Sequence, residues 1–537
     1  MKKWKKLLAL SLGIATMGLV LAGCGDDSGG GTAETPADQN GGGNEPVATE
    51  APADDTPAEV APIRIMAPVL TEVAPEDDSV VQRTIEELTG FEMDITWIPN
   101  SAYGDRLSLV LAGDDVPEVL IVPGVPNNDP VIVSGVSHGA FWNLDPFIDQ
   151  FNYLSMMNSG IRMNASFNGD TYGIYRARDL IRASINIRRD WLDELGLDLP
   201  TTLEEFTDMC FAFRDEIEGD TYCLTIPQWN GKNNHGPLDI IAVMFGAPNR
   251  TAIVDGEVVF DFMTEEYIEA MEWVRMLVEE GLINPDFVTM PTDDWNNDFM
   301  NDRAGAIMDM QSRGMSLSNL MRDRHEAEDG SAWVAMIGNF STPNADAILP
   351  TTGFNGGIMI PTASVQTEER LLEVLTFLNY LNSEEIHTIL NLGVEDVHWH
   401  WNEDNVFERI INPDEAIDRQ DVATIASFAQ IGMGVSGFVL PAPFNEETGT
   451  LLELERVAIR DGQRYQDIAV FNPTQAFVSD TATLRGAILD DIMLDARIQF
   501  VAGQIDRAGF EAEVQRWLDS GGYTVIEELT ELYHAAQ

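Results

Sequence analysis

Lysine is almost absent from this 537-residue chain. Four lysines lie within the first six residues, and Lys232 is the only other one. Asp and Glu number 89 against 31 Lys and Arg, so the formal net charge is −58. A chain this acidic excludes nucleic acid as an expected partner and disfavours close contact with anionic lipid. Strongly anionic ligands are disfavoured too, unless a local group of arginines reverses the field.

Cysteine is equally scarce, with only Cys24, Cys210 and Cys223. In an oxidising compartment Cys210 and Cys223 could form a disulfide that closes a short loop. Two buried thiols fit the same spacing, because spacing alone does not establish the geometry that a disulfide needs. Neither of these two cysteines has a neighbouring histidine in the sequence, so a catalytic cysteine is not expected.

Long apolar runs and nucleotide-binding motifs are missing after the N-terminus. No later stretch reaches the roughly 20 apolar residues that a membrane helix needs. The P-loop pattern G-x-x-x-x-G-K-S/T does not occur. Any membrane permease or ATPase that works with this protein is therefore expected to be a separate chain.

The N-terminus has the parts of a secretory signal: early lysines, an apolar run over 7–20 and small residues before Cys24. The tetrad Leu21-Ala22-Gly23-Cys24 resembles the lipobox of bacterial lipoproteins, in which the cysteine is lipidated and becomes the first mature residue. We therefore expect residues 1–23 to be removed, which changes the formal charge to −62. An ordinary secretory signal with an accidental cysteine is the alternative.

Residues 24–62 are rich in Gly, Pro, Ala, Thr and acid and contain no aromatic residue. Such a segment cannot bury enough apolar surface to offset the entropy of ordering it. We expect it to be a flexible acidic tether between the lipid and a folded body.

The body alternates short apolar runs with amphipathic stretches, which is typical of α/β architecture. A β-α-β-α-β run at its start predicts a parallel sheet with right-handed crossovers, and a second region of the same kind begins near Ser184. The expected elements are strand 63–66, helix 77–89, strand 93–98, helix 103–112, strand 119–122, strand 185–188, helix 189–195, strand 223–226, helix 264–281, strands 306–308 and 357–360, helix 367–382 and a largely helical C-terminal part from Thr481.

Seven stretches in this order resemble the extracellular solute-binding lipoproteins that feed ABC-type sugar importers. They are YGDRLSLVLAGDDVPEVLIV (103–122), GAFWNLDPFID (139–149), NGDTYGIYRARD (168–179), NIRRDWLDELGLDLPTTLEEF (186–206), EWVRMLVEEGLINPDF (272–287), RAGAIM (303–308) and LNYLNSEE (378–385). The resemblance covers nearly the whole body. It implies two α/β lobes with a hinge, a ligand enclosed in the cleft between them, and hinge closure around that ligand.

From the resemblance we expect a first lobe over 63–180, with return segments near 300–355. The second lobe is expected over 181–299 and 356–537. The chain departs from the family at 214–224, which lacks the alternating Asp and Asn of a calcium loop, so calcium is not expected there. At 393–396 a family Gly-x-Glu-Gly turn is Gly-Val-Glu-Asp.

Three patterns raise the question of other chemistry. Residues 135–139 (GVSHG) match the nucleophile elbow G-x-S-x-G, with 131–133 as a candidate strand, but the following segment contains a proline and is a poor helix. His398 and His400 could bind a metal from one side of a strand, but the sequence offers no third ligand nearby. Carboxylate pairs are too common among 89 acids to indicate a glycosidase.

Ligand-binding residues are expected in loops next to strand ends at the lobe interface, where open α/β sheets bind ligands. Trp faces suit sugar rings, and amide, carboxylate and guanidinium groups suit hydroxyls or a carboxylate. Core packing is the alternative for each aromatic residue. The candidates are Gln228 and Trp229, Arg176 and Arg178 near the first crossing between lobes, Asp309 and Gln311, Phe354, Trp295, and the pair Trp399 and Trp401.

We therefore expect a monomeric, lipid-anchored binding protein on the extracytoplasmic face of the bacterial membrane. It would capture a carbohydrate, most simply an oligosaccharide, and deliver it to ABC permease subunits, with no catalytic residue, cofactor or metal. A surface polysaccharide hydrolase and a ligand sensor without transport are the alternatives.

Overall fold

The computed structural model describes residues 61–69, 74–228, 236–325, 333–403, 406–411, 419–441 and 450–537. All of them belong to one compact unit, Val60–Gln537. Two hydrophobic cores organise this unit, each around its own β-sheet. None of the described helices is long and apolar enough to cross a membrane.

The first sheet has the strand order β2-β1-β3-β11-β4. Its strands are β1 (Ile63–Val69), β2 (Met93–Pro99), β3 (Val119–Val122), β4 (Gly173–Ala177) and β11 (Phe354–Met359). β1 pairs with β2 and β3 in parallel, as the β-α-β-α-β pattern predicts. β11 runs antiparallel to both β3 and β4, so the complete sheet is mixed.

Helices on both sides of this sheet follow local sequence signals. α1 (Val80–Thr89) begins at Ser79, whose side chain accepts from the Gln82 amide, and ends at Gly90 in the left-handed conformation. The hydroxyl of Tyr103, in α2 (Asn100–Leu111), lies 2.9 Å from the Met66 carbonyl oxygen and 2.7 Å from the Ile121 carbonyl oxygen, and it can donate a hydrogen bond to either. The remaining helices of this half are α3 (Pro130–Ser137), α4 (Asp145–Ile148), α5 (Ser159–Asn164), α12 (Glu368–Tyr380), α13 (Glu384–Leu392) and α14 (Arg419–Phe428), with the short helices η1 (Pro126–Asn128) and η2 (Leu154–Met156) and the hairpin β12 (Trp399–Trp401) and β13 (Phe407–Arg409).

The second sheet has the order β10-β5-β9-β6. Its strands are β5 (Ala183–Arg188), β6 (Tyr222–Leu224), β9 (Ala304–Met310) and β10 (Val334–Ile337). Every residue of β5 is buried, which matches its position between two neighbours. The elements around it are α6 (Arg189–Leu195), α7 (Leu203–Asp215), α8 (Pro237–Met244), β7 (Thr251–Val254), β8 (Glu257–Phe260), η3 (Asp261–Met263), α9 (Glu265–Glu279), η4 (Thr292–Asp294), α10 (Trp295–Met300), α11 (Gln311–His325), α15 (Leu451–Asp461) and α16 (Gln463–Asp467).

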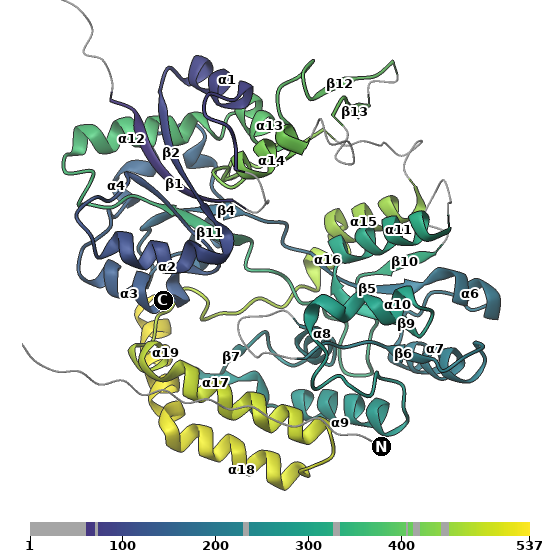
Figure 1. The fold of residues 1–537 in the computed structure, drawn as a ribbon. Coiled ribbons are helices and arrows are strands. Elements are labelled where there is room, and N and C mark those ends of the chain that lie inside the picture. Colours follow the sequence, from purple (N-terminus) through teal and green to yellow (C-terminus); the bar gives the residue numbers. More distant parts are fainter. Residues whose placement is uncertain are drawn as a thin grey trace, which may run out of the picture. The chain divides into compact units, whose positions relative to one another are not determined.

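The C-terminal part is helical, as expected, and consists of α17 (Asp480–Val501), α18 (Arg507–Trp517), η6 (Leu518–Gly522) and α19 (Tyr523–Ala535). α17 packs against both α9 and α18 (Figure 1). Its buried residues, among them Met493 and Phe500, belong to the core of the second sheet.

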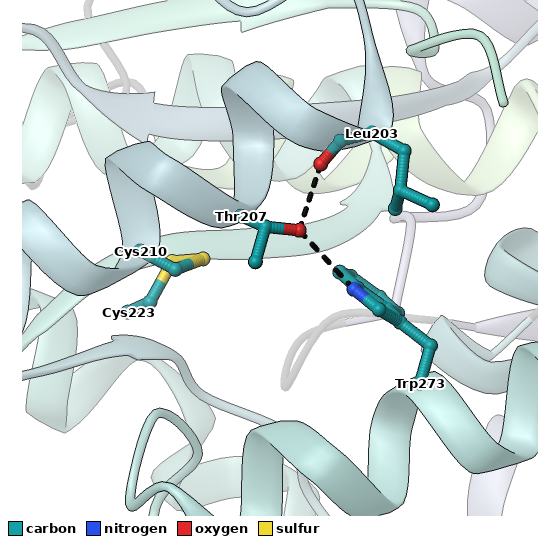
Figure 2. The surroundings of a disulfide bond; sticks show 5 residues. All are labelled: Leu203, Thr207, Cys210, Cys223 and Trp273. Atoms are coloured by element: carbon teal, nitrogen blue, oxygen red, sulfur yellow. Dashed lines mark hydrogen bonds between the residues drawn. A yellow bond between two sulfur atoms is a disulfide. The ribbon is translucent and has the colours of Figure 1, made fainter.

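A disulfide joins Cys210 of α7 to Cys223 of β6 (Figure 2). Both cysteines are fully buried in the second core. One turn earlier on α7, the Thr207 hydroxyl donates to the Leu203 carbonyl and accepts from the Trp273 indole at 3.2 Å. The bridge and this hydrogen bond attach α7 to the sheet and to α9, respectively.

The structure corrects the expected division of the chain into lobes. The first lobe, defined by the first core, contains residues 63–177 and 354–435, whereas the second lobe contains 183–349 and 452–529. Residues 304–349 therefore belong to the second lobe rather than the first, and residues 356–435 belong to the first. Strand pairing decides this, because β9 joins β5 and β6 while β11 is inserted between β3 and β4.

Candidate functional site

Segments 178–182 and 350–353 connect the two lobes, and a third connection lies between 435 and 452, where residues 442–449 are outside the described part. The first two connections are hydrogen-bonded to each other: the Thr351 amide donates to the Leu180 carbonyl at 2.7 Å, and the Arg178 amide to the Gly353 carbonyl at 2.9 Å. The Ala177 amide donates to the Met433 carbonyl at 2.7 Å, near the start of the third. Residues next to these connections can contact both lobes, which is the geometry of a hinged binding site.

Arg176 lies at the end of β4, directly before the first connection, and is only 5% exposed. Its guanidinium donates to the carbonyls of Gly432 and Ala429 and to the Gln430 side chain, at 3.3, 3.4 and 3.0 Å. A fourth, longer contact reaches the Asn355 carbonyl at 3.5 Å. All four acceptors are neutral. Burial, together with the charge of Arg178, lowers the pKa of Arg176 to about 10.

Arg178 and Arg182 stand at the two ends of the first connection, and both are half-buried. Arg178 donates from Nη1 to the Ala177 carbonyl at 2.9 Å. Burial lowers the pKa of Arg178, the charge of Arg182 lowers it further, and Asp179 partly compensates. Within the described ranges, no carboxylate lies within 4 Å of Arg176, Arg178 or Arg182.

A polar group of the second lobe forms around Asp309, near the end of β9. Asp309 accepts from Nε of Arg313, one turn into α11. Arg313 also donates to the Asn296 side chain at 2.7 Å and lies 4.2 Å from the centroid of the Trp295 ring. Trp295 itself is 4% exposed, and its indole donates to the Thr225 carbonyl at 2.8 Å. Trp295 therefore packs inside the second lobe, which agrees with core packing, the alternative to ligand binding for each aromatic candidate.

Gln311 and Phe354 are both buried. The Gln311 amide donates to the Arg182 carbonyl at 2.8 Å, and its side chain donates to the Ile181 carbonyl at 3.1 Å. It thus fastens the first connection to the start of α11. Phe354 lies in the first core, while its neighbour Asn355 is exposed.

The two tryptophans of β12 have different surroundings. Trp399 is 4% exposed, and its indole donates to the Gly393 carbonyl at 3.0 Å. Trp401 is 41% exposed and contacts Trp399 edge-on. Asp396, at the expected second glycine of the turn, has a φ of 62°, in the left-handed region.

The histidines beside these tryptophans do not converge. His398 is buried, its Nδ1 accepts from the Val394 amide at 2.8 Å, and burial lowers its pKa. The His400 imidazole is half-exposed and lies 3.8 Å from the Glu408 carboxylate. Among the described residues, no three His, Cys, Asp or Glu side chains are grouped as a metal site would require.

Of the remaining residues singled out in the sequence, Gln228 lies within the described part of the chain, whereas Trp229 and Cys24 do not. Gln228 is exposed at the end of the segment that follows β6.

Residues 131–133, the candidate strand of a nucleophile elbow, are part of α3, and the Ser137 hydroxyl donates to the Ser134 carbonyl at 2.8 Å. The strand–Ser–helix context of an elbow is therefore wrong for 135–139.

A cavity of about 390 Å³ opens between the first lobe and the C-terminal helices. Sequence reasoning missed it, because its wall comes from five separate segments. The polar and aromatic lining includes Asn127, Asn128, Arg250, Asp261, Arg497 and Trp517. A smaller cavity, of about 60 Å³, reaches Thr351 and Thr352 of the second connection.

Arg182 and Arg313 were also missed. Arg182 could have been found, since three arginines within seven residues stand out in so acidic a chain. Arg313 had no such signal, because only the fold brings it onto Trp295 and Asn296.

A scan against models of known protein families finds no match. Lipoprotein LipO of Bacillus subtilis (strain 168) is 36% identical over 482 residues, covering 88% of this chain and 93% of LipO. The chain belongs to the solute-binding lipoproteins of ABC-type saccharide importers.

Two further similarities extend over most or all of this solute-binding lipoprotein. The polygalacturonan/rhamnogalacturonan-binding protein YtcQ of the same bacterium is 28% identical, covering 100% of this chain and 99% of YtcQ. An extracellular solute-binding protein from Bifidobacterium longum subsp. infantis has the same fold, with a TM-score of 0.69 at 14% identity, covering 89% of this chain and 99% of that one. The two-lobed α/β fold and the extracytoplasmic location follow from the family. YtcQ and the Bifidobacterium protein are both named as binding proteins.

Proposed function

We propose that this protein captures an oligosaccharide between its two lobes and delivers it to an ABC permease. The observation that carries the proposal is the hydrogen-bonded pair of lobe connections, flanked on one side by Arg176 and Arg178 and on the other by Gln311. Membership of the family and the ligand named for YtcQ support a carbohydrate.

The lobes supply what a sugar needs. Asp309, Arg313 and Asn296 form a group in which donors and acceptors are already held in place, so a bound hydroxyl meets fixed partners. Exposed Trp401 offers an apolar ring face, and Gln228 an amide, for the same ligand. Bending of the connections at 178–182 and 350–353 would close the lobes around it.

The protein acts at the membrane surface without entering the bilayer. Cys24 carries the lipid, and residues 25–62 serve as the tether. The permease then receives the ligand-bound form, the protein works as a monomer, and no bond of the sugar is broken.

Isothermal titration calorimetry with the secreted body, residues 61–537, tests this. The panel contains neutral and acidic oligosaccharides and short peptides, and each sugar is analysed by chromatography afterwards. Saturable binding of one sugar class, recovered intact, is expected. Binding of peptides alone would overturn the carbohydrate ligand, and recovery of shortened sugar would overturn the binding-protein assignment in favour of a hydrolase.

A further inference from the structure

The first connection between the lobes, 178–182, and the strand end before it carry an unusual concentration of positive charge. Most arginines of the described residues have an Asp or Glu within 4 Å, as expected where acids outnumber bases almost threefold. Arg176, Arg178 and Arg182 do not, although they lie within seven residues of one another. Three positively charged side chains thus lie close together in the sequence without carboxylate partners, although Asp and Glu are abundant in the rest of the chain.

Burial makes this arrangement unfavourable in the protein alone. Removing a cation from water without an anion nearby destabilises its charged form, and neighbouring cations add repulsion. Arg176 is the most buried of the three, and among the described residues only neutral carbonyl and amide oxygens accept from it. These four acceptors hold its guanidinium in one place, so a fixed positive charge lies close enough to Arg178 for the two to repel each other.

Among the described residues, no Asp or Glu of the second lobe forms an ion pair within 4 Å of these three arginines. Asp309, which lies on β9 opposite Ser184 of β5, is paired with Arg313. Asp179, within the connection, lies near enough to influence both Arg178 and Arg460 but forms no ion pair within 4 Å among the described residues. Three arginines against the single carboxylate of Asp179 therefore give this connection a net positive charge in a strongly negative protein.

We propose that the captured oligosaccharide is acidic, with uronate carboxylates that pair with Arg178 and Arg182. This inference rests on the proposed function and names its substrate class. A planar guanidinium can donate two parallel hydrogen bonds to a carboxylate, and such charge-assisted pairs are the strong ones. Arg176 is a positioning residue: it makes the potential more positive without contacting the sugar.

The same geometry discriminates against neutral sugars. Without a carboxylate, closing the lobes would further desolvate Arg178 and Arg182 while leaving them unpaired, which opposes closure. The carboxylates of an acidic sugar pair with Arg178 and Arg182, so closure of the lobes around such a sugar is favourable. The local arginines thus reverse the general expectation that so acidic a protein avoids anionic ligands.

The test compares two trisaccharides that differ only at C6: α-1,4-linked trigalacturonate and its carboxyl-reduced form, α-1,4-linked galactotriose. We expect the wild-type body to bind trigalacturonate at least about tenfold more tightly, the ratio that one good charge-assisted pair supplies. The ratio should shrink as NaCl is raised to about 1 M, where the Debye length is only about 3 Å.

Arg178→Gln and Arg182→Gln should each lower the affinity for trigalacturonate by about tenfold or more. The affinity for galactotriose should stay the same or rise, because closure no longer desolvates an unpaired charge at that position. Arg485→Gln is the matched control, because it removes the same charge from an exposed position on α17. Circular dichroism and melting curves verify that each variant is folded, and the wild-type comparison requires no variant.

The outcomes separate the two proposals. Equal or tighter binding of galactotriose by the wild type overturns the acidic ligand and keeps oligosaccharide capture. Loss of binding to both sugars in Arg178→Gln overturns carboxylate recognition in the same way. If the wild type binds no member of the sugar panel, the proposed function itself fails.

Discussion

Arg370 and Glu118, 252 residues apart, form a two-point ion pair in which Nε and Nη2 of the arginine donate to the two carboxylate oxygens at 2.7 and 2.8 Å. Glu118 directly precedes β3, and Arg370 lies in the first turn of α12. Both side chains are largely buried, and the pair raises the pKa of Arg370. It attaches the returning segment, 354–435, to the N-terminal part of the first lobe.

Glu118→Gln should lower the free energy of unfolding by about 2–3 kcal/mol, because Arg370 would lose its buried counter-charge and keep only the more exposed Glu373. Urea unfolding followed by tryptophan fluorescence measures this. Asp115→Asn is the matched control: Asp115 pairs with Arg64 but its side chain is 95% exposed, so no measurable change is expected. Equal effects of the two substitutions would contradict the prediction.

Replacing both Cys210 and Cys223 by alanine should destabilise the second lobe. The disulfide closes a loop with a sequence separation of 13, and loops of this size contribute about 3 kcal/mol by restricting the unfolded chain. Differential scanning calorimetry with and without reductant measures it. Reductant should lower the melting temperature of the wild type and leave that of the double variant unchanged; a wild type insensitive to reductant throughout unfolding would refute the role.

Gly305→Ala and Gly104→Ala should have effects of opposite sign. A Cβ at Gly305 would lie 2.1 Å from the ring of Phe213, which is fully buried and cannot move aside, so a loss of about 2–3 kcal/mol is expected. A Cβ at Gly104, inside α2, meets nothing within 4 Å, and alanine there should stabilise by about 0.5–1 kcal/mol. Melting temperatures of the two variants decide whether packing or helix propensity dominates at each position.

Asp261 should make the second lobe less stable as the pH rises from about 4 to 6. Burial raises its pKa to about 6, Arg497 opposes the shift and Asp239 adds to it. Because the folded state binds this proton more tightly than the unfolded state, the stabilisation is complete below the ordinary pKa of 3.8 and is lost through pH 6.

The free energy of unfolding of Asp261→Asn should therefore rise relative to that of the wild type as the pH is raised. Between pH 4 and pH 7 the difference between the two proteins should shift by up to about 3 kcal/mol in favour of the variant. Melting curves of both proteins at unit steps of pH measure the difference. Parallel pH profiles would show that Asp261 titrates alike in the folded and unfolded chain, contrary to its burial.

Local sequence signals predicted most secondary structure of the body correctly. The helices expected over 77–89 and 264–281 occur as α1 and α9, and strand 119–122 occurs with the expected bounds. Strands 63–66 and 93–98 occur with small extensions. Apolar periodicity and capping act within a few residues, so they can be read from the chain. Residues 131–133 show the limit: an apolar β-branched run became a helix because Asp129 caps it and Pro130 begins it.

The site was predicted less completely. Arg176 and Arg178 lie beside the first connection as expected, but Trp295 and Trp399 are buried, and Gln311 braces the connection through hydrogen bonds to Ile181 and Arg182. Exposure of a side chain depends on neighbours from distant segments, which composition and spacing do not contain.

The amino-acid sequence alone was sufficient for the family, the α/β class and the order of elements, because seven matching stretches and short-range periodicity carry that information. The tertiary structure decided which lobe residues 304–349 and 354–435 join and whether Cys210 meets Cys223. It also decided which arginines of the described part of the chain have no carboxylate within 4 Å. Each of these depends on pairing between segments far apart in the chain, where strand register and burial, rather than local preference, select the partner.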